Sequence, residues 1–117
     1  MTEEQASAWL GALLSAKRGL SWRKNSLLLT ITSSDESLID SVAKVTATEN
    51  QVIKYRDTYS QKPLYQWWVR NDAALAVIER ARPYIFGEFA STSDWFIVEY
   101  KRRKADKLKR KKHSTRE

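Results

Sequence analysis

The sequence contains no cysteine, one histidine, three glycines and two prolines among its 117 residues. The absence of cysteine excludes disulfide bonds, thiolate zinc sites and cysteine nucleophiles. His113 is the only histidine and lies in a charged segment, so a Ser-His-Asp triad and a multi-histidine metal site are excluded as well. The sequence also lacks a secretory signal pattern and any apolar run that could span a bilayer. We therefore expect an intracellular protein that has no membrane partner.

The net charge of +7 is unevenly distributed along the chain. Residues 1–100 hold 11 Lys/Arg and 12 Asp/Glu, a balance of −1, whereas residues 101–117 hold 10 Lys/Arg and 2 Asp/Glu, a balance of +8. We predict one domain over residues 1–100 and a basic C-terminal tail over residues 101–117. Such a dense tail favours binding to a polyanion through counterion release, and a solvated tail that aids solubility is the alternative.

Residues 3–17 predict a helix with one apolar face, because leucines and a tryptophan recur at spacings of three and four. Small residues occupy many of the remaining positions, and Gly11 lies in the middle of the helix. Glycine there costs about 1 kcal/mol of helix propensity relative to alanine, which indicates that another helix backbone approaches closely. An ordinary alanine-rich amphipathic helix fits the pattern equally well. After the helix, Gly19 permits a left-handed C-cap.

The rest of residues 1–100 alternates pairs of strands with helices. Ser33 and Glu36 have the spacing of a capping box, and Asn71 or Asp72 caps a later helix that Pro83 ends. The elements predicted after the first helix are strands over 20–24 and 26–32, a helix over 33–48, strands over 51–57 and 64–70, a helix over 72–82, and a last helix from Ser93, whose residues 95–98 could instead be a strand. This order predicts an α+β fold, α-β-β-α-β-β-α-α, in which helices cover one face of an antiparallel sheet.

The second face of this sheet is expected to remain open. Period-two alternation places every second side chain of a strand on the same face. The residues assigned to the open face in this way form a basic, hydrogen-bonding and aromatic set: Arg23, Lys54, Arg56, Gln66, Trp68 and Arg70. Such a set favours nucleic-acid binding, and the alternative for each residue is the ordinary solubility of an exposed face.

Four segments, in their order and spacing, resemble the single-motif LAGLIDADG homing endonucleases. Residues 9–18 (WLGALLSAKR) resemble the signature helix of the family, and residues 19–22 (GLSW) resemble the strand that follows it. Residues 62–69 (KPLYQWWV) resemble the second strand pair, and residues 74–84 resemble the helix that ends in a Pro-Tyr step. The likeness extends from about residue 6 to about residue 100.

The resemblance implies a homodimer, because the family packs two signature helices against each other and this chain contains one. It also implies that the two sheets form a saddle whose concave face lies in the major groove of duplex DNA. The residues implied at the dimer interface are Ser7, Ala8, Gly11, Ala12 and Ser15. The residues implied as DNA contacts are Lys17, Arg23, Lys24, Lys54, Arg56, Lys62, Gln66, Trp68 and Arg70.

Lys17 departs from the family pattern at the position where members that cut DNA carry an acid. That acid binds a divalent cation, and an ammonium group repels one. Ser15 replaces the second acid of the motif, and Ala16 and Arg18 on either side of Lys17 are not acidic. We therefore expect sequence-specific binding of duplex DNA, with no catalytic residue, no metal site and no other cofactor.

Besides an α+β protein with a basic tail that has only protein partners, two alternatives remain open. In the first, the protein is an active magnesium-dependent homing endonuclease that takes its carboxylate from elsewhere. In the second, it is an RNA-binding protein similar to intron maturases, in which Trp22 and Trp68 stack on unpaired bases.

Overall fold

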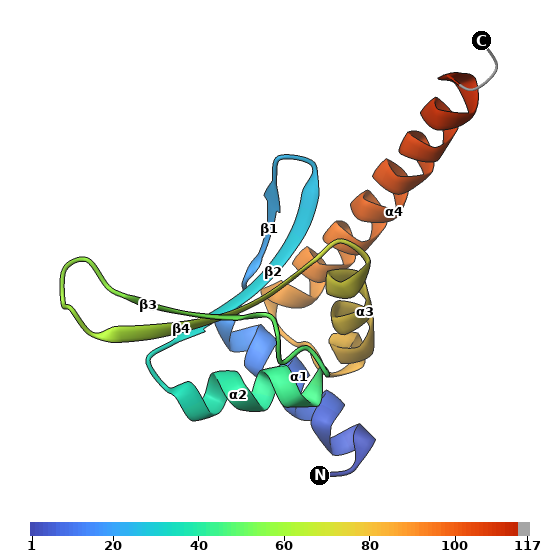
Figure 1. The fold of residues 1–117 in the computed structure, drawn as a ribbon. Helices are drawn as coiled ribbons and strands as arrows, with labels where there is room; N and C mark the ends of the chain where they lie inside the picture. Colours follow the sequence, from blue (N-terminus) through green and yellow to red (C-terminus); the bar gives the residue numbers. More distant parts are fainter. Residues whose placement is uncertain (115–117) are drawn as a thin grey trace.

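The structure is a computed structural model that describes residues 1–114, with side chains described through residue 110. Residues 115–117 of the predicted tail lie outside the described residues, as does the side chain of His113. The elements follow the predicted order (Figure 1): α1 Glu3–Lys17, β1 Leu20–Arg23, β2 Ser26–Ser33, α2 Glu36–Val45, β3 Val52–Arg56, β4 Pro63–Arg70, α3 Asp72–Ala81, the 3-10 turn η1 Arg82–Tyr84, and α4 Glu88–Ser114.

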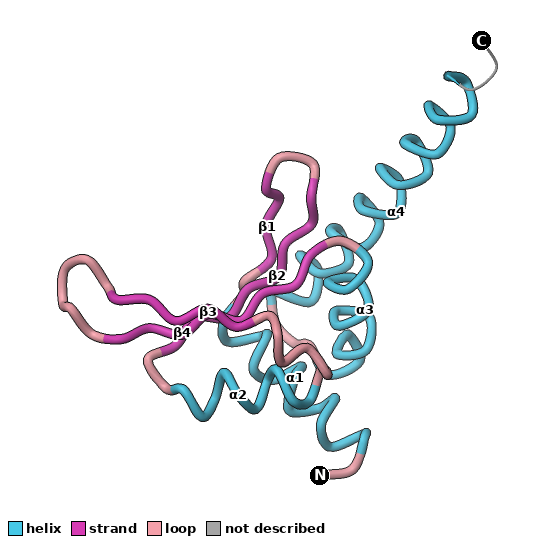
Figure 2. The backbone as a smooth tube through the Cα atoms, viewed as in Figure 1, coloured by secondary structure: helices cyan, strands magenta, loops and turns pink. Residues whose placement is uncertain are grey.

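Within the described residues, four strands form one antiparallel sheet in the order β1-β2-β4-β3. The β1–β2 and β3–β4 hairpins diverge from the centre of the sheet, which gives it a strongly bent shape (Figure 2). Helices α1, α2 and α3 lie on one side of this sheet, and its other side is left open (Figure 1). The predicted α+β fold with helices on one face is confirmed.

The core lies between the helices and the covered face of the sheet. Leu10 and Leu14 of α1 are fully buried, as is Trp67 at the centre of β4. The indole nitrogen of Trp67 donates a hydrogen bond of 2.7 Å to the hydroxyl of Thr48, so this large ring is buried without an unpaired donor. The core therefore fixes the position of the sheet against α1.

The two ends of α1 are capped differently. Its N-terminus carries a capping box, in which the Thr2 hydroxyl and the Gln5 side chain each accept from the other's backbone N–H. At its C-terminus the left-handed residue is Arg18 (φ 49°), not Gly19 as predicted. Gly19 is required for a different reason, because a Cβ there would overlap the backbone carbonyl of Thr30 in β2. Gly19 thus lets the end of α1 pass directly against the sheet.

The caps of α2 and α3 also differ from the predictions. The Asp35 side chain caps α2 by accepting from the Leu38 backbone N–H at 3.3 Å, whereas Ser33 accepts from the N–H of Asp35. The capping box predicted for Ser33 and Glu36 is therefore wrong by two residues. Asn71 is the N-cap of α3, with φ 54°, but its side-chain oxygen accepts from the backbone N–H of Leu27 at 3.1 Å. That bond ties the start of α3 to the start of β2.

Helix α4 is longer than predicted and includes residues 95–98, so the alternative of a strand there is wrong. It starts at Glu88 and continues without a break past residue 100, the predicted end of the domain. Phe89 and Tyr100 are buried, and the last turns of the helix project beyond the other elements (Figure 1). No helix among residues 1–114 is both long and apolar enough to cross a membrane.

Candidate nucleic-acid interface

The strands of residues 1–114 contain no acidic residue. Their charged side chains are all basic, and they are Arg23, Lys54, Arg56 and Arg70. A surface that meets a polyanion avoids carboxylates, because a like charge facing phosphate is unfavourable. The composition of the strands is therefore suited to binding an anionic partner on the open face of the sheet.

The strand register decides which side chains share the open face. Residues directly opposite each other in an antiparallel pair lie on the same face. The open-face pairs are Arg23 with Ser26, Leu28 with Arg70, Thr30 with Trp68, Thr32 with Gln66, and Gln66 with Ile53. The predictions that Arg23, Gln66, Trp68 and Arg70 lie on this face agree with the register.

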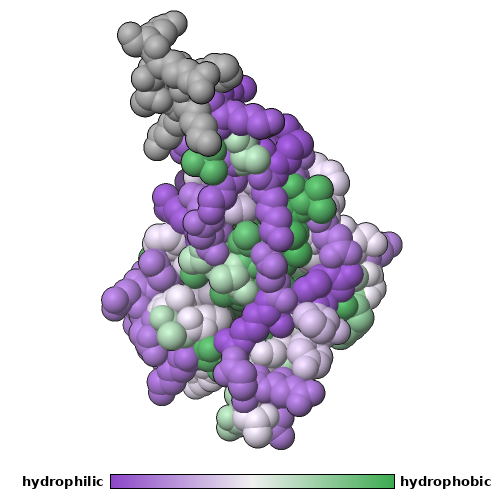
Figure 3. All heavy atoms as spheres, turned by 90° about the vertical axis from the view of Figure 1, so that its right-hand side faces the viewer, coloured by the Kyte–Doolittle hydropathy of each residue, from purple (hydrophilic) through white to green (hydrophobic). Residues whose placement is uncertain are grey.

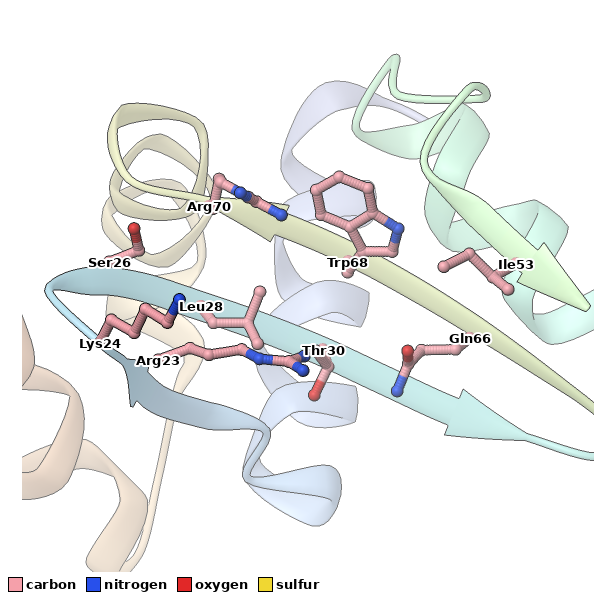
Figure 4. Close-up of a pocket in the computed structure, with 9 residues that line it drawn as sticks. All are labelled: Arg23, Lys24, Ser26, Leu28, Thr30, Ile53, Gln66, Trp68 and Arg70. Atoms are coloured by element: carbon pink, nitrogen blue, oxygen red, sulfur yellow. The ribbon is translucent and has the colours of Figure 1, made fainter. Parts of the chain in front are cut away.

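These side chains line a shallow cavity of about 360 Å³ on the open face (Figure 4). All four strands and the β1–β2 turn contribute to it. Its lining consists of Arg23, Lys24, Ser26, Leu28, Thr30, Ile53, Gln66, Trp68 and Arg70. The cavity thus combines cationic groups at the hairpin end, hydrogen-bonding groups along β2 and β4, and apolar groups between them.

Two interactions orient polar groups within this cavity. The Gln66 amide nitrogen donates to the Thr32 hydroxyl at 3.1 Å, and this bond uses one of the two N–H donors of the amide. The guanidinium carbon of Arg70 lies 4.9 Å from the ring centroid of Trp68. This cation–π contact holds a charged donor over the sheet without pairing it with a carboxylate. Both groups are thereby positioned for a ligand with acceptors and anionic oxygens.

Lys54 and Arg56 were predicted on the open face, and the register contradicts this. Lys54 pairs with Tyr65, whose ring is buried on the helix side of the sheet, and its ammonium nitrogen lies 5.5 Å from the centroid of that ring. Arg56 pairs with Pro63 on the same side. Ile53 and Tyr55, the alternate residues of β3, occupy the open face instead. They are exposed by 48% and 40%, because no helix covers this face of the sheet.

Two further basic residues predicted as contacts, Lys24 and Lys62, lie at the hairpin turns. Lys24 follows β1 with a φ of 59° and lines the cavity. Lys62 is exposed in the β3–β4 loop, where its carbonyl accepts from the Asp57 N–H. The same loop presents Tyr59, which is 97% exposed. Tyr59 is not among the predicted contacts, because no pattern in the sequence distinguishes an exposed loop tyrosine from one that folds back.

Trp22 was considered as an exposed stacking residue, and the structure contradicts this. Its register partner is the buried Leu27, so it lies on the helix side of the sheet. There its ring stacks on Phe96 with centroids 5.5 Å apart, and the Arg103 guanidinium lies 4.0 Å from the ring centroid. Trp68 remains on the open face, with Arg70 over its ring.

Helix α1 turns its small residues to two different sides. Ser7 accepts a hydrogen bond of 2.9 Å from Arg80, and Ser15 accepts one of 3.2 Å from the backbone N–H of Phe86. Gly11 lies between them and packs against η1 so closely that a Cβ would overlap it. The close approach predicted at Gly11 therefore exists, but its partner is η1 of the same chain and not another helix. Of the five small residues predicted at a dimer interface, these three are buried within the chain.

A second side of α1, about 100° around the helix axis from the first, carries Ala12 and Ala16, which are exposed, and Ala8, which is half-buried. Their spacing of four residues places them in one row along the helix. This row has no charged side chain, and it leaves the backbone of α1 accessible. Of the residues predicted at a dimer interface, Ala8 and Ala12 thus lie on the outer side.

The C-terminal end of α1 meets the middle of the sheet, where the Thr30 N–H donates to the Gly19 carbonyl at 3.0 Å. Lys17, the last residue of α1, is exposed. The carboxylate of Glu88 lies 3.9 Å from the guanidinium of Arg18, with which it forms an ion pair. Among the described residues, no three His, Cys, Asp or Glu side chains gather as metal ligands. The end of α1 thus presents an exposed ammonium group and, beside it, a carboxylate that is already ion-paired.

Two solved structures of the homing endonuclease I-CvuI are similar to this chain. One is in complex with its target (Sro1.3) in the presence of calcium, with a TM-score of 0.60. The other is in complex with the I-CreI target (C1221) in the presence of magnesium, with the DNA not cleaved, and its TM-score is 0.61. In both, the identity is 12%, and the similarity covers 85% of this chain and 68% of the other.

No family model and no curated protein sequence matches the chain. Likeness at 12% identity shows the fold alone. The chain has a homing-endonuclease fold.

Proposed function

We propose that the protein binds duplex DNA on the open face of its sheet, as a homodimer and without metal-dependent cleavage. The observation that carries this proposal is the open face itself. It is free of carboxylates and holds Arg23, Arg70 and Gln66, the side-chain types that pair with guanine and adenine edges in the major groove. The I-CvuI structures, which contain target DNA, support the same partner.

The chemistry of Arg23, Arg70 and Gln66 allows them to recognise the edges of DNA bases. Arginine offers two parallel donors to guanine, and glutamine offers one donor and one acceptor to adenine. The basic residues at the hairpin ends, Lys24 and Lys62, are suited to phosphates. Lys54 and Arg56 lie at the edge strand on the other face, so we assign them at most to phosphate contacts.

The homodimer is proposed through the outer side of α1. Alanines allow two helix backbones to approach closely, and a row at intervals of four residues supports self-complementary packing about a two-fold axis. Ala8, Ala12 and Ala16 form such a row, whereas Ser7, Gly11 and Ser15 already have partners within the chain. A dimer of this kind would join two open faces into one surface.

The proposed lack of cleavage follows from the end of α1. A metal-dependent nuclease uses carboxylates to hold a cation that activates water. At this position the chain presents the ammonium group of Lys17, and the nearby carboxylate of Glu88 forms an ion pair with Arg18. Lys17 is suited to hold a phosphate of the bound duplex instead.

The test is a selection experiment with the purified chain and a library of random duplexes, in which bound DNA is recovered and sequenced with and without magnesium. A two-fold-related consensus in uncut DNA is the expected result. Fragments with defined ends that appear only with magnesium would mean that the protein is an active endonuclease. Failure to enrich any duplex, with RNA as the better competitor, would overturn the proposal in favour of an RNA-binding protein.

A further inference from the structure

Helix α4 is attached to the side of the β1–β2 hairpin that faces away from the open face. Its Phe96 and Arg103 enclose the ring of Trp22, which lies on the helix side of β1. The neighbouring Arg23 pairs with Ser26 on the open face. The hairpin therefore separates α4 from the candidate nucleic-acid interface, and none of the described α4 side chains lines that cavity.

Polar contacts fix the direction of α4. The Tyr100 hydroxyl donates to Asp72 of α3 at 2.7 Å, and the Lys104 ammonium lies 2.9 Å from the same carboxylate. Within the helix, Glu99 accepts from both Arg102 and Arg103, which lowers the pKa of its carboxyl to about 2. Two elements of the body thus hold the helix up to Lys104, and the turns beyond that point continue in a set direction.

The charge of α4 changes at the same place. Up to Lys104, its basic residues pair with carboxylates, as in the ion pairs of Lys101 with Glu79 and Arg102 with Asp106. Residues 105–114 contain one acidic residue, Asp106, and the segment KLKRKK over residues 107–112. Lys107, Lys109 and Arg110 are exposed. The part of α4 that projects from the body is therefore the part with a large basic excess.

The arrangement of these charges distinguishes among anionic partners. At about 100° per residue, Lys107 and Lys109 lie on nearly opposite sides of the helix. A membrane or the flat surface of an acidic protein contacts one side of a helix only. The major groove of DNA is about 12 Å wide, admits an α-helix and has phosphates along both of its walls. Among the described side chains of this segment, Leu108 is the one large apolar group that is exposed, and a single such group is too little to favour insertion into lipid.

We infer that the projecting end of α4 is a second duplex-binding element, which lies in the major groove of a stretch of DNA other than the one on the open face. From residue 105 to residue 114 the helix is about 15 Å long, enough to follow the groove for a few base pairs. Figure 3, which views the molecule from the side of α4, shows that the described atoms of this part are largely hydrophilic. Lysine and arginine contacts of this kind hold phosphates and carry no base preference. The inference rests on the proposed binding of duplex DNA.

The test compares the wild-type chain with the triple variant K107Q/K109Q/R110Q. Binding is measured against salt on two duplexes, the shortest that retains full preference for the selected consensus and one extended at both ends. On the extended duplex we expect the slope of log K against log salt to be shallower for the triple variant by about 2–3, since each lost phosphate contact lowers it by about 0.9. On the short duplex we expect equal slopes and equal affinities.

The variant L108Q is the matched control, because it changes the same turn without changing its charge, and we expect wild-type binding. Equal slopes for the triple variant and the wild type on the extended duplex would overturn the inference. So would an equal loss on both duplexes, since the end of α4 would then contact the same stretch as the sheet. Weakening by L108Q to the level of the triple variant would indicate an apolar contact and would also overturn it.

A second variant, R23A/R70A, separates this inference from the proposed function. If it loses preference for the consensus while the triple variant behaves as wild type on both duplexes, only the inference about α4 fails. If the wild type binds neither duplex, the proposed function fails together with the inference.

Discussion

Gly11 lies directly against Tyr84, and a Cβ at position 11 would overlap the side-chain Cβ and the backbone carbonyl of that tyrosine. Helix α1 therefore packs against its own chain through the side that carries Gly11, which we call its inner side. Its outer side, with Ala12 at the same level, is the side open to a second copy. The two sides can be tested separately, because a substitution on the inner side affects folding and a substitution on the outer side affects self-association.

For the inner side, we predict that Gly11→Ala lowers the free energy of unfolding by about 1–3 kcal/mol, the usual cost of overpacking a closed contact. The measurement is urea denaturation followed by circular dichroism. Ala12→Ser, one residue along the helix on the exposed side, is the matched control and is expected to change stability by less than about 0.5 kcal/mol. If Gly11→Ala were as stable as this control, the contact with Tyr84 would not be close.

For the outer side, we predict that Ala12→Arg disrupts self-association and leaves the monomer folded. A charged side chain there would meet its own copy across a two-fold axis, which combines steric overlap with like-charge repulsion. Sedimentation equilibrium would detect the change in mass, and thermal unfolding would check the fold. A variant with unchanged mass in solution would exclude this row of alanines as the dimer interface, whether the wild type is a monomer or a dimer.

The strand register places the basic residues of the sheet on two different faces, with Arg23 and Arg70 on the open face and Lys54 and Arg56 on the helix face. We predict that Arg23→Ala and Arg70→Ala each reduce discrimination between the consensus and a mismatched duplex, by about 1–3 kcal/mol for a residue that pairs with a base. Lys54→Ala and Arg56→Ala are expected to weaken both duplexes equally, because these residues lie on the other face. Competition binding with matched and mismatched duplexes measures the difference. Loss of discrimination with Lys54→Ala would contradict the assignment of faces.

The Glu99 carboxylate provides a prediction for pH dependence. Arg102 and Arg103 lower its pKa from 4.5 to about 2, so the folded state favours the charged form. This contribution to stability is complete above about pH 4.5 and is lost as the pH falls toward 2. We expect the melting temperature of the wild type to fall across this range more steeply than that of Glu99→Gln, which cannot titrate there. Parallel curves for the two proteins would show that the ion pairs do not stabilise the fold.

Ser93 is fully buried in α4, and its hydroxyl has no hydrogen-bond partner among the described residues. We predict that Ser93→Ala is neutral or increases the free energy of unfolding by up to about 1–2 kcal/mol, since it removes a buried polar group without a partner. Ser91→Ala, at an exposed position of the same helix, is the control for the higher helix propensity of alanine. A destabilised Ser93→Ala variant would mean that the hydroxyl has a partner, such as a buried water.

Local patterns in the sequence predicted the order of the elements and, for α1, both of its ends. They also placed Gln66, Trp68 and Arg70 on the open face, because β4 lies inside the sheet and its alternation reflects burial on one side. The same rule failed for Lys54 and Arg56. They lie on β3, an edge strand with little burial on either face, so its apolar residues do not mark the core.

The other failures concern contacts between distant parts of the chain. The neighbour of Gly11 is η1, which is 71 or more residues away in sequence, and no periodicity in α1 identifies it. The extent of α4 and the position of Trp22 depend on each other, since Phe96 and Arg103 cover the ring. Such pairs leave no local signal in the sequence, and the three-dimensional arrangement reveals them.

The presence of Ile53 and Leu28 beside the arginines of the open face has a chemical consequence for the proposed DNA complex. Aliphatic side chains in the major groove contact the C5-methyl group of thymine, which cytosine and uracil lack. Recognition on this surface would then depend partly on methyl groups. A consensus duplex synthesised with deoxyuridine in place of thymidine would keep every Watson–Crick pair and every phosphate, and yet bind more weakly.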